Sequence, residues 1–506
     1  MDRGRVPAPP PAAILTRYRA RTLDPTGAEL LADQETYPTA YVADRLLLRR
    51  SCRTETRQLL DPLAGRVGLR VREGRTSRCL HLVPDGQPAV SDAWRVLQAL
   101  RGDQGGAAAR RLGVGLDHLM FATTAGPTIR PLPYYESHPY RPLPYYESHP
   151  YGPHPYYESH ASPTAQYGRL GFGATQPVNL VLERPRRTAL GFRRPVVAVL
   201  DTGCGPHPWL DEAVRRDVTL DGVRVSDPGS ALDTDGDLAG PVDGMRDVLA
   251  GHGTFICGLV RQSCPDADII PVPVIHADGV VIESELLTAL HRLAELARRH
   301  AAGTGGHPID VVSLSLGYYH ESPADAAHDS ALHEALDELG ELGVAVVASA
   351  GNDATAQPMF PAAFAPNKAG PVFEPLPSSV PLTSVGALNP NGTIALFSNT
   401  GTWVRHWEPG AAVVSTMPLF DHAGLPVARV PDPYHPDLMR ETIDPDSFAS
   451  GFAVGSGTSF AAPVLAGRIA QKLIDNARAE GGIALDAVGD QAVERGSRAL
   501  TALLTS

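Results

Sequence analysis

Between about residues 191 and 480, short apolar runs alternate with segments of helical character. The runs PVVAVLD, DIIPVPVI, IDVVSLSLG and GVAVVASAG are rich in β-branched residues, as strands covered on both faces require. Segments such as ESELLTALHRLAELARR and SALHEALDELGELG separate them and are typical of helices. This alternation predicts an α/β unit, a parallel sheet with helices on both faces.

A second ordered pattern occupies residues 38–123. It predicts a strand in AYVADRLLLRR, a helix in TETRQLLDPLAG, strands in GLRVREG and CLHLVPDG, a helix in VSDAWRVLQALR and a final strand in VGLDHLMFA. The order β-α-β-β-α-β predicts a small α+β domain with the ferredoxin-like arrangement. Residues 1–37, rich in Pro and Ala, predict a mobile arm, and residues 481–506 a C-terminal helical extension.

The intervening residues 124–190 form a linker with an internal repeat. The phrase RPLPYYESHPY occurs twice in succession, and a looser third copy follows. Pro fixes φ and restricts the residue before it, so an extended, semi-rigid spacer is expected. Histidine-rich tracts also bind metals, but few acidic partners accompany these histidines, so the spacer interpretation is favoured. They are His138, His149, His154 and His160.

Composition limits the possible functions. The 506 residues carry a net charge of -12, which disfavours a general nucleic-acid binder because phosphate contacts need basic surface. No apolar run suits a signal peptide or a membrane span. Five scattered cysteines do not form a disulfide framework. A cytoplasmic protein without membrane or nucleic-acid partners is therefore expected.

Four polar residues occur where an α/β sheet places its chemistry. Asp201 ends the first apolar strand, and His252 lies between two glycines at the start of an apolar helix. Asn352 follows another buried strand and offers an amide donor, while Ser459 lies at the head of the helix in GTSFAAPVLAG. The carboxyl ends of parallel strands meet at one edge, and a helix N-terminus favours an oxyanion. The sequence thus predicts that these side chains converge.

Over residues 191–480 the chain resembles the subtilase (subtilisin-like serine protease) family. The resemblance rests on the segments VAVLDTGCGPHPWL, GHGTFICGLV, VVSLSLG, SAGND, MFPAAF and GTSFAAPVLAG. It implies a subtilisin-like fold and a serine endopeptidase with Ser459 as nucleophile, His252 as general base and Asp201 as its orienting carboxylate. Asn352 matches the oxyanion-hole donor, and no cofactor is required for the chemistry.

The resemblance also implies where a peptide or protein substrate binds. An extended peptide would add as a strand between two segments, beside a wall of the primary specificity pocket. The implied residues are Ser313, Leu314, Ser315, Leu316 and Gly317 on one side, Asp278, Gly279 and Val280 opposite, and Ser349, Ala350 and Gly351 in the wall.

Several alternatives stay open. Residues 38–123 are either a propeptide-like domain that inhibits the cleft, with self-cleavage between about residues 120 and 190, or a permanent accessory domain. The segment DTDGD has oxygen ligands at calcium-like spacing but lacks a closing Glu, so Asp233, Asp235 and Asp237 are weak candidates for a structural calcium site. A catalytically idle fold used as a peptide-binding scaffold is the alternative function.

Overall fold

The structure is a computed structural model of the whole chain. It describes residues 9–28, 35–52, 54–74, 78–86, 89–104, 112–122, 175–226, 232–238, 246–326, 330–367, 378–420, 429–443, 447–479 and 482–504. We refer to residues 9–122 as the N-terminal unit and to residues 175–504 as the C-terminal unit. The RPLPYYESHPY repeat and most of the predicted linker lie outside the described residues.

The centre of the C-terminal unit is a parallel sheet. Within the described residues it has six strands in the order β10-β7-β12-β14-β15-β16, and each neighbouring pair is parallel. The strands are β7 (Val196–Asp201), β10 (Asp268–Pro273), β12 (Val311–Leu314), β14 (Ala345–Ser349), β15 (Thr383–Leu388) and β16 (His406–Pro409). Every residue of β7, β12 and β14 is buried, as the β-branched runs predicted.

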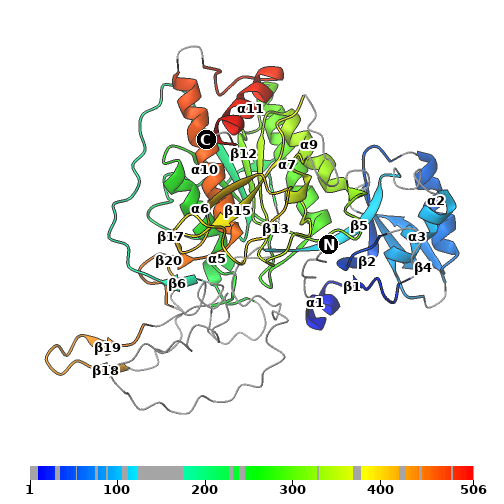
Figure 1. Cartoon of the computed structure of the whole chain (residues 1–506), viewed down its shortest axis with the longest axis horizontal. Coiled ribbons are helices and arrows are strands. Elements are labelled where there is room, and N and C mark those ends of the chain that lie inside the picture. Colours follow the sequence, from blue (N-terminus) through cyan, green and yellow to red (C-terminus); the bar gives the residue numbers. More distant parts are fainter. Residues whose placement is uncertain are drawn as a thin grey trace.

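Helices cover this sheet on both sides (Figure 1). On one side, α6 (His252–Ser263) packs against α10 (Thr458–Arg478). On the other, α7 (Glu283–Ala301) packs against α9 (Ala331–Glu341). Each of α7 and α9 has an apolar face with buried leucines and an opposite polar face, the pattern of a helix that covers a core. The unit therefore has the α/β fold with helices on both faces that the sequence predicted.

Smaller elements complete the C-terminal unit. They are α5 (Leu232–Asp235), the 3₁₀ helix η3 (Ala362–Phe364), α11 (Asp490–Leu504), and the strands β6 (Thr175–Pro177), β8 (Thr219–Leu220), β9 (Val223–Arg224), β11 (Val280–Ile282), β13 (Leu316–Gly317), β17 (Val413–Thr416), β18 (Arg429–Pro431), β19 (Met439–Glu441) and β20 (Phe452–Gly455). The hairpin of β18 and β19 projects from the body (Figure 1). Helix α11 occupies most of the predicted C-terminal extension and packs against α10.

The N-terminal unit contains an antiparallel sheet. Its strands are β1 (Ala20–Leu23), β2 (Thr39–Leu48), β3 (Leu69–Glu73), β4 (Cys79–Pro84) and β5 (Val114–Ala122), and its helices are α1 (Ala12–Arg17), α2 (Thr54–Gly65) and α3 (Ala93–Gln104). From β2 onward the elements follow the order β-α-β-β-α-β, and the sheet order is β5-β2-β4-β3. Leu46, Leu60, Leu80 and Leu97 belong to a separate core of this unit.

One strand joins the two units. Strand β5 pairs with β2 in its own unit, and its last residues pair antiparallel with both β11 and β13 of the C-terminal unit. Phe121 stands opposite both Val280 and Gly317, and Ala122 opposite Leu316. The C-terminal end of β5 therefore lies between two segments of the other unit.

The prediction of a mobile arm over residues 1–37 is wrong for residues 9–28. These residues contain α1 and β1, and β1 pairs antiparallel with β2. Ile14 is buried, and Tyr18 donates a 2.8 Å hydrogen bond to Asp278. The elements are too short to show a periodicity in sequence, and long-range contacts hold them in place. Within the described residues, no helix combines the length and the apolar character that crossing a membrane demands.

Candidate active site

Asp201 and His252 form a buried pair at the carboxyl edge of the central sheet. Asp201 is the last residue of β7, and His252 is the first residue of α6. The Nδ1 atom of His252 lies 2.7 Å from Oδ1 of Asp201, and the side chains are almost fully inaccessible. The Nε2 atom of His252 has no hydrogen-bond partner. A carboxylate at Nδ1 fixes the tautomer that leaves Nε2 available as a base.

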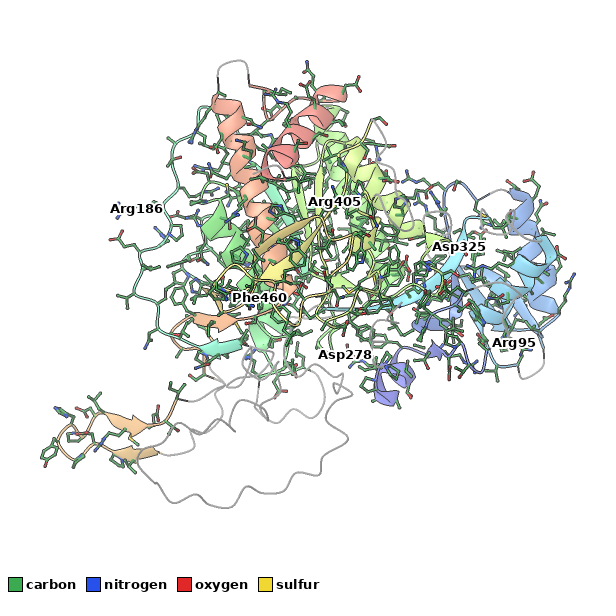
Figure 2. The ribbon with its side chains drawn as sticks, in the orientation of Figure 1. Arg95, Arg186, Asp278, Asp325, Arg405 and Phe460 are labelled. Carbon is green, nitrogen blue, oxygen red and sulfur yellow. The ribbon has the colours of Figure 1, made fainter. Side chains whose placement is uncertain are left out.

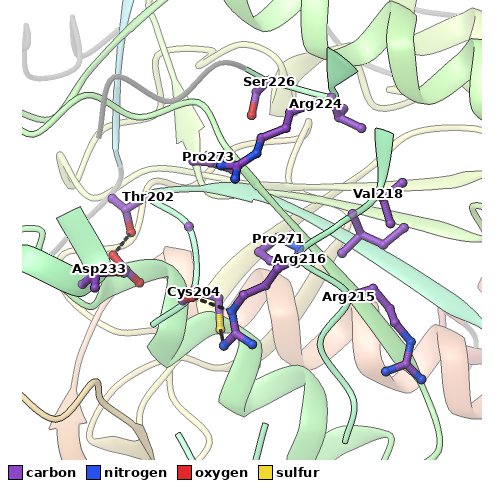
Figure 3. A pocket seen from close by; sticks show the side chains of 14 residues that line it. Thr202, Cys204, Arg215, Arg216, Val218, Arg224, Ser226, Asp233, Pro271 and Pro273 are labelled. Atoms are coloured by element: carbon purple, nitrogen blue, oxygen red, sulfur yellow. Dashed lines mark hydrogen bonds between the residues drawn. The ribbon is translucent and has the colours of Figure 1, made fainter. Parts of the chain in front are cut away.

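A second carboxylate, Asp233 on α5, fixes the segments that carry this pair. It accepts hydrogen bonds from the hydroxyl of Thr202 at 2.6 Å and from the backbone N–H of Gly251 at 3.1 Å. The backbone N–H and the hydroxyl of Thr254 also donate to it, at 2.8 and 2.6 Å. Figure 3 shows the Thr202–Asp233 bond beside a cavity of about 260 Å³. Asp233 thus links the residue after Asp201 to the residues around His252.

The surroundings of Asp233 act on its pKa in opposite directions. Complete burial raises the pKa above its usual value, while the hydrogen bonds donated by Thr202 and Thr254 lower it. The net direction is upward, because removing the carboxylate from water outweighs the donors.

Ser459 lies in the first turn of α10. Its backbone carbonyl accepts a 3.0 Å hydrogen bond from the Ser315 hydroxyl, and the side chain is fully buried. The ring of the next residue, Phe460, is centred 5.5 Å from the ring of His252. Figure 2 shows Phe460 well inside the C-terminal unit. Since α10 packs directly on α6, Ser459 belongs to the same edge as the Asp201–His252 pair.

Asn352 faces the start of the same helix. Its side-chain oxygen accepts the backbone N–H of Thr458 at 2.9 Å, and this bond leaves the Nδ2 group without a partner. The preceding residue, Gly351, has φ +100°, and a Cβ there would lie 2.4 Å from atoms of Asn399 and Met359. Only glycine fits this turn. The turn presents an amide donor next to the N-terminus of α10.

The predicted substrate-binding residues are divided between two environments. Leu316 and Gly317 form β13, and Val280 begins β11; both strands border β5. The carbonyl of Gly279 accepts the N–H of Ala122 at 3.3 Å. Asp278 contacts α1 instead, through Arg17 at 3.2 Å and Tyr18; Figure 2 shows it on the side of the unit that faces α1.

Ser313 and Leu314 lie elsewhere, inside β12, where they pair with β7 and β14. Their position in the middle of the central sheet separates them from β5. Ser349 ends β14 and Ala350 bonds to Val385 of β15, so the predicted pocket wall leads from the sheet to the turn at Gly351.

The three calcium candidates are not brought together. Asp233 is buried and accepts four donors, whereas Asp235 is exposed and Asp237 is half-buried. No group of three metal-ligating side chains includes them within the described residues. Sequence reasoning missed the structural use of Asp233. No local signal was available, because Asp233 lies 18 and 21 positions before Gly251 and Thr254, whose N–H groups it accepts.

A profile of the Subtilase family matches residues 193–480. The chain belongs to the Subtilase family. Membership identifies it as a hydrolase of the serine endopeptidase class.

Curated relatives match this subtilase at low identity. Subtilisin BL of Lederbergia lenta is 28% identical over 238 residues, which cover 45% of this chain and 68% of that protein. An alkaline protease of Alkalihalobacillus alcalophilus is also 28% identical, and 48% of it is covered. Mycosin-4 of Mycobacterium tuberculosis is 25% identical over 284 residues, which cover 54% of each chain. The match thus spans about half to two thirds of these relatives.

A solved structure, that of a cold adapted subtilisin-like serine proteinase, is 21% identical to this subtilase. The two align with a TM-score of 0.36 over 62% of this chain and 85% of the other.

Proposed function

We propose that this subtilase hydrolyses peptide bonds through Asp201, His252 and Ser459, by way of an acyl-enzyme. The observation that carries the proposal is the buried 2.7 Å contact between His252 and Asp201, which leaves Nε2 of the imidazole without a partner. In the first step Nε2 takes the Ser459 hydroxyl proton as Oγ attacks the substrate carbonyl. His252 then gives that proton to the leaving amine, and water releases the acyl group by the same steps.

The surrounding groups stabilise the charges of this reaction. Asp201 faces the imidazolium that forms when His252 takes the proton, and both side chains are shielded from water, so their attraction is strong. The Nδ2 group of Asn352 and the backbone N–H of Ser459 are assigned to the oxyanion of the tetrahedral intermediate. No cofactor is needed for any of these steps.

A substrate peptide is proposed to bind as β5 does. The two strands that border β5 offer backbone groups to an antiparallel strand, and this pairing does not depend on side chains. Gly317 is required by the packing of its own unit, because a Cβ there would lie 2.2 Å from the Met359 side chain and 2.8 Å from the carbonyl oxygen of Phe360. The substrates are therefore extended segments of peptides or proteins.

The N-terminal unit is proposed to be an intramolecular inhibitor. The end of β5 occupies the place between β11 and β13 that a substrate strand needs. The chain leaves β5 at Ala122, opposite Leu316, and the residue before Leu316, Ser315, donates its hydroxyl to the carbonyl of Ser459. Self-cleavage is therefore expected soon after residue 122, inside the predicted interval of residues 120–190.

A fluorophosphonate probe tests the catalytic proposal. Wild-type protein should be labelled, and the Ser459→Ala variant should not. A second measurement is N-terminal sequencing after incubation, which should find a cut after residue 122 in wild type only. If folded wild type is neither labelled nor cut, the chain is a peptide-binding scaffold and the proposal fails. If it is labelled and active but stays whole, only the inhibitor proposal fails.

A further inference from the structure

Two histidines and a glutamate meet in the interior where the two units touch. His118 lies in β5 of the N-terminal unit, and His320 and Glu321 follow β13 in the C-terminal unit. Their exposed fractions are 2%, 1% and 0%. None of them belongs to the proposed catalytic set.

Their ligand atoms converge. Nε2 of His118 lies 2.9 Å from Oε2 of Glu321, and Nδ1 of His320 lies 3.4 Å from the same oxygen. One nitrogen from each histidine and one oxygen from Glu321 all lie within 4.8 Å of one another. This is the one such group of three among the residues that the structure describes.

The contact made by Nδ1 of His118 determines what can lie between Nε2 of His118 and Oε2 of Glu321. Nδ1 lies 2.7 Å from Oε2 of Glu283, at the start of α7, so its proton is directed to that carboxylate. The lone pair of Nε2 then faces a carboxylate oxygen of Glu321, and two acceptors at 2.9 Å require a cation between them, either a proton or a metal ion. A histidine that donates one N–H to a carboxylate and offers the other nitrogen is the usual arrangement of a metal ligand.

We propose that His118, His320 and Glu321 bind a zinc ion, with Glu283 orienting His118. Imidazole nitrogens and one carboxylate oxygen suit zinc and disfavour calcium or magnesium. Ligand atoms 2.0–2.2 Å from a tetrahedral zinc lie about 3.4 Å from one another. Side-chain rotations that move these atoms by roughly 1 Å therefore bring all three to that spacing. Zinc replaces the bridging proton, which leaves to solvent.

Two contacts surround the proposed ligand atoms. The first can remain when zinc binds, and the second is replaced by it. Arg101 lies 3.6 Å from the other oxygen of Glu321, Oε1, and leaves Oε2 for the metal. Nδ1 of His320 accepts the backbone N–H of Ser322 at 3.0 Å; coordination through this nitrogen takes the place of that bond. The fourth zinc position is left for water.

An ion here would join the two units, because one ligand comes from β5 and two come from the C-terminal unit. His118 is three residues before Phe121, which pairs with Gly317. Zinc would thus hold the end of β5 in place. The consequence that zinc prolongs inhibition rests on the proposed function, but binding itself does not.

Zinc binding is measured on the full chain with Ser459→Ala, which cannot cut itself. The repeat histidines His138, His149, His154 and His160 are replaced by Gln in every sample to remove competing ligands. Equilibrium dialysis against micromolar zinc, followed by metal analysis, should find one zinc per chain. His118→Gln and His320→Gln should each weaken binding by more than about 10-fold, and cobalt in place of zinc should give the absorption of a tetrahedral site.

Matched variants keep the test decisive. His291→Gln alters another histidine at the boundary, which contacts Arg78, and should bind zinc normally. Glu321→Gln preserves side-chain volume and should lose zinc while its thermal unfolding stays cooperative. No zinc in the parent chain, or undiminished zinc in a folded Glu321→Gln or His118→Gln variant, overturns the proposal. Both outcomes are independent of peptidase activity.

Discussion

Asp233 holds the two segments that present Asp201 and His252, so its charge and shape bear on catalysis without touching the substrate. In Asp233→Asn an amide N–H₂ replaces one acceptor oxygen and meets the donors of Thr202 or Thr254. We expect kcat to fall about 10- to 100-fold with a small change in KM, because a positioning error acts on the transition state. The unfolding free energy should fall by about 1–3 kcal/mol.

Steady-state kinetics and denaturant unfolding check this prediction. The matched control is Asp217→Asn, which makes the same change at an exposed carboxylate. It should change neither kcat nor the unfolding free energy. An unaltered kcat in Asp233→Asn would mean that the hydrogen bonds only add stability.

Asn352 offers a second prediction, since its Nδ2 group has no partner in the structure. Asn352→Ala should lower kcat about 10²–10³-fold, a range established on subtilisin itself, and leave KM nearly unchanged. The comparison is Asn391→Ala, whose amide lies in an exposed loop. If the two variants have the same kcat, then groups other than the Asn352 amide stabilise the oxyanion.

The sequence motifs predicted these residues because each one combines a strand end or helix start with glycines that expose a polar side chain. Asp201 at the end of β7 is an example, and Asn352 after β14 is another. What the motifs left out depends on distant contacts. Asp233 bonds to Thr254 across 21 positions and His118 to Glu321 across 203, separations over which no local pattern extends.

Among the elements, the buried apolar strands were the most predictable, because a sheet covered on both faces leaves an unbroken apolar run. Strand β7 matches PVVAVLD within one residue. Within the predicted substrate-binding segment, residues 313–317, the sequence did not show which residues face a substrate strand. Ser313 and Leu314 belong to β12 and pair inside the central sheet, and only Leu316 and Gly317 pair with β5. The run is uniform in sequence, so the change of partner had no signal.

Helix α9 contributes a pH-dependent contact between the units. Arg50 of the N-terminal unit lies 2.7 Å from Glu338. Burial raises the pKa of Glu338, but His291, Arg50 and Arg298 together lower it to about 2. His291 and Arg298 lie in the same unit as Glu338 and lower its pKa whether or not the units are docked, so only the contribution of Arg50 favours docking. This contribution is present while Glu338 is ionised and is lost as the pH falls toward 2.

The measurement uses wild type after self-cleavage, with size-exclusion chromatography of the two fragments between pH 7 and 3. Retention of the N-terminal fragment should decline as the medium becomes acidic. Glu338→Gln should show weaker retention at pH 7 and a flatter pH profile. Identical profiles for the two proteins would exclude this contact as the cause.

For the molecule as a whole, the RPLPYYESHPY repeat is predicted to act only as a spacer between its units. Deletion of residues 141–151 removes one copy and leaves every proposed catalytic residue in place. The peptide-hydrolysis kcat of the mature form should stay within about 2-fold of wild type, since loop length changes closure entropy only slightly. A large loss of turnover would give the repeat a direct catalytic role.

For the proposed self-cleavage, the placement of β5 between β11 and β13 of its own chain also predicts the kinetic order. The strand is already delivered to the site by the fold, so no encounter between molecules is needed, and the effective concentration is set by the chain itself. The half-time of the first cut should therefore be independent of protein concentration over a roughly hundred-fold dilution. A half-time that lengthens on dilution would show instead that one molecule processes another.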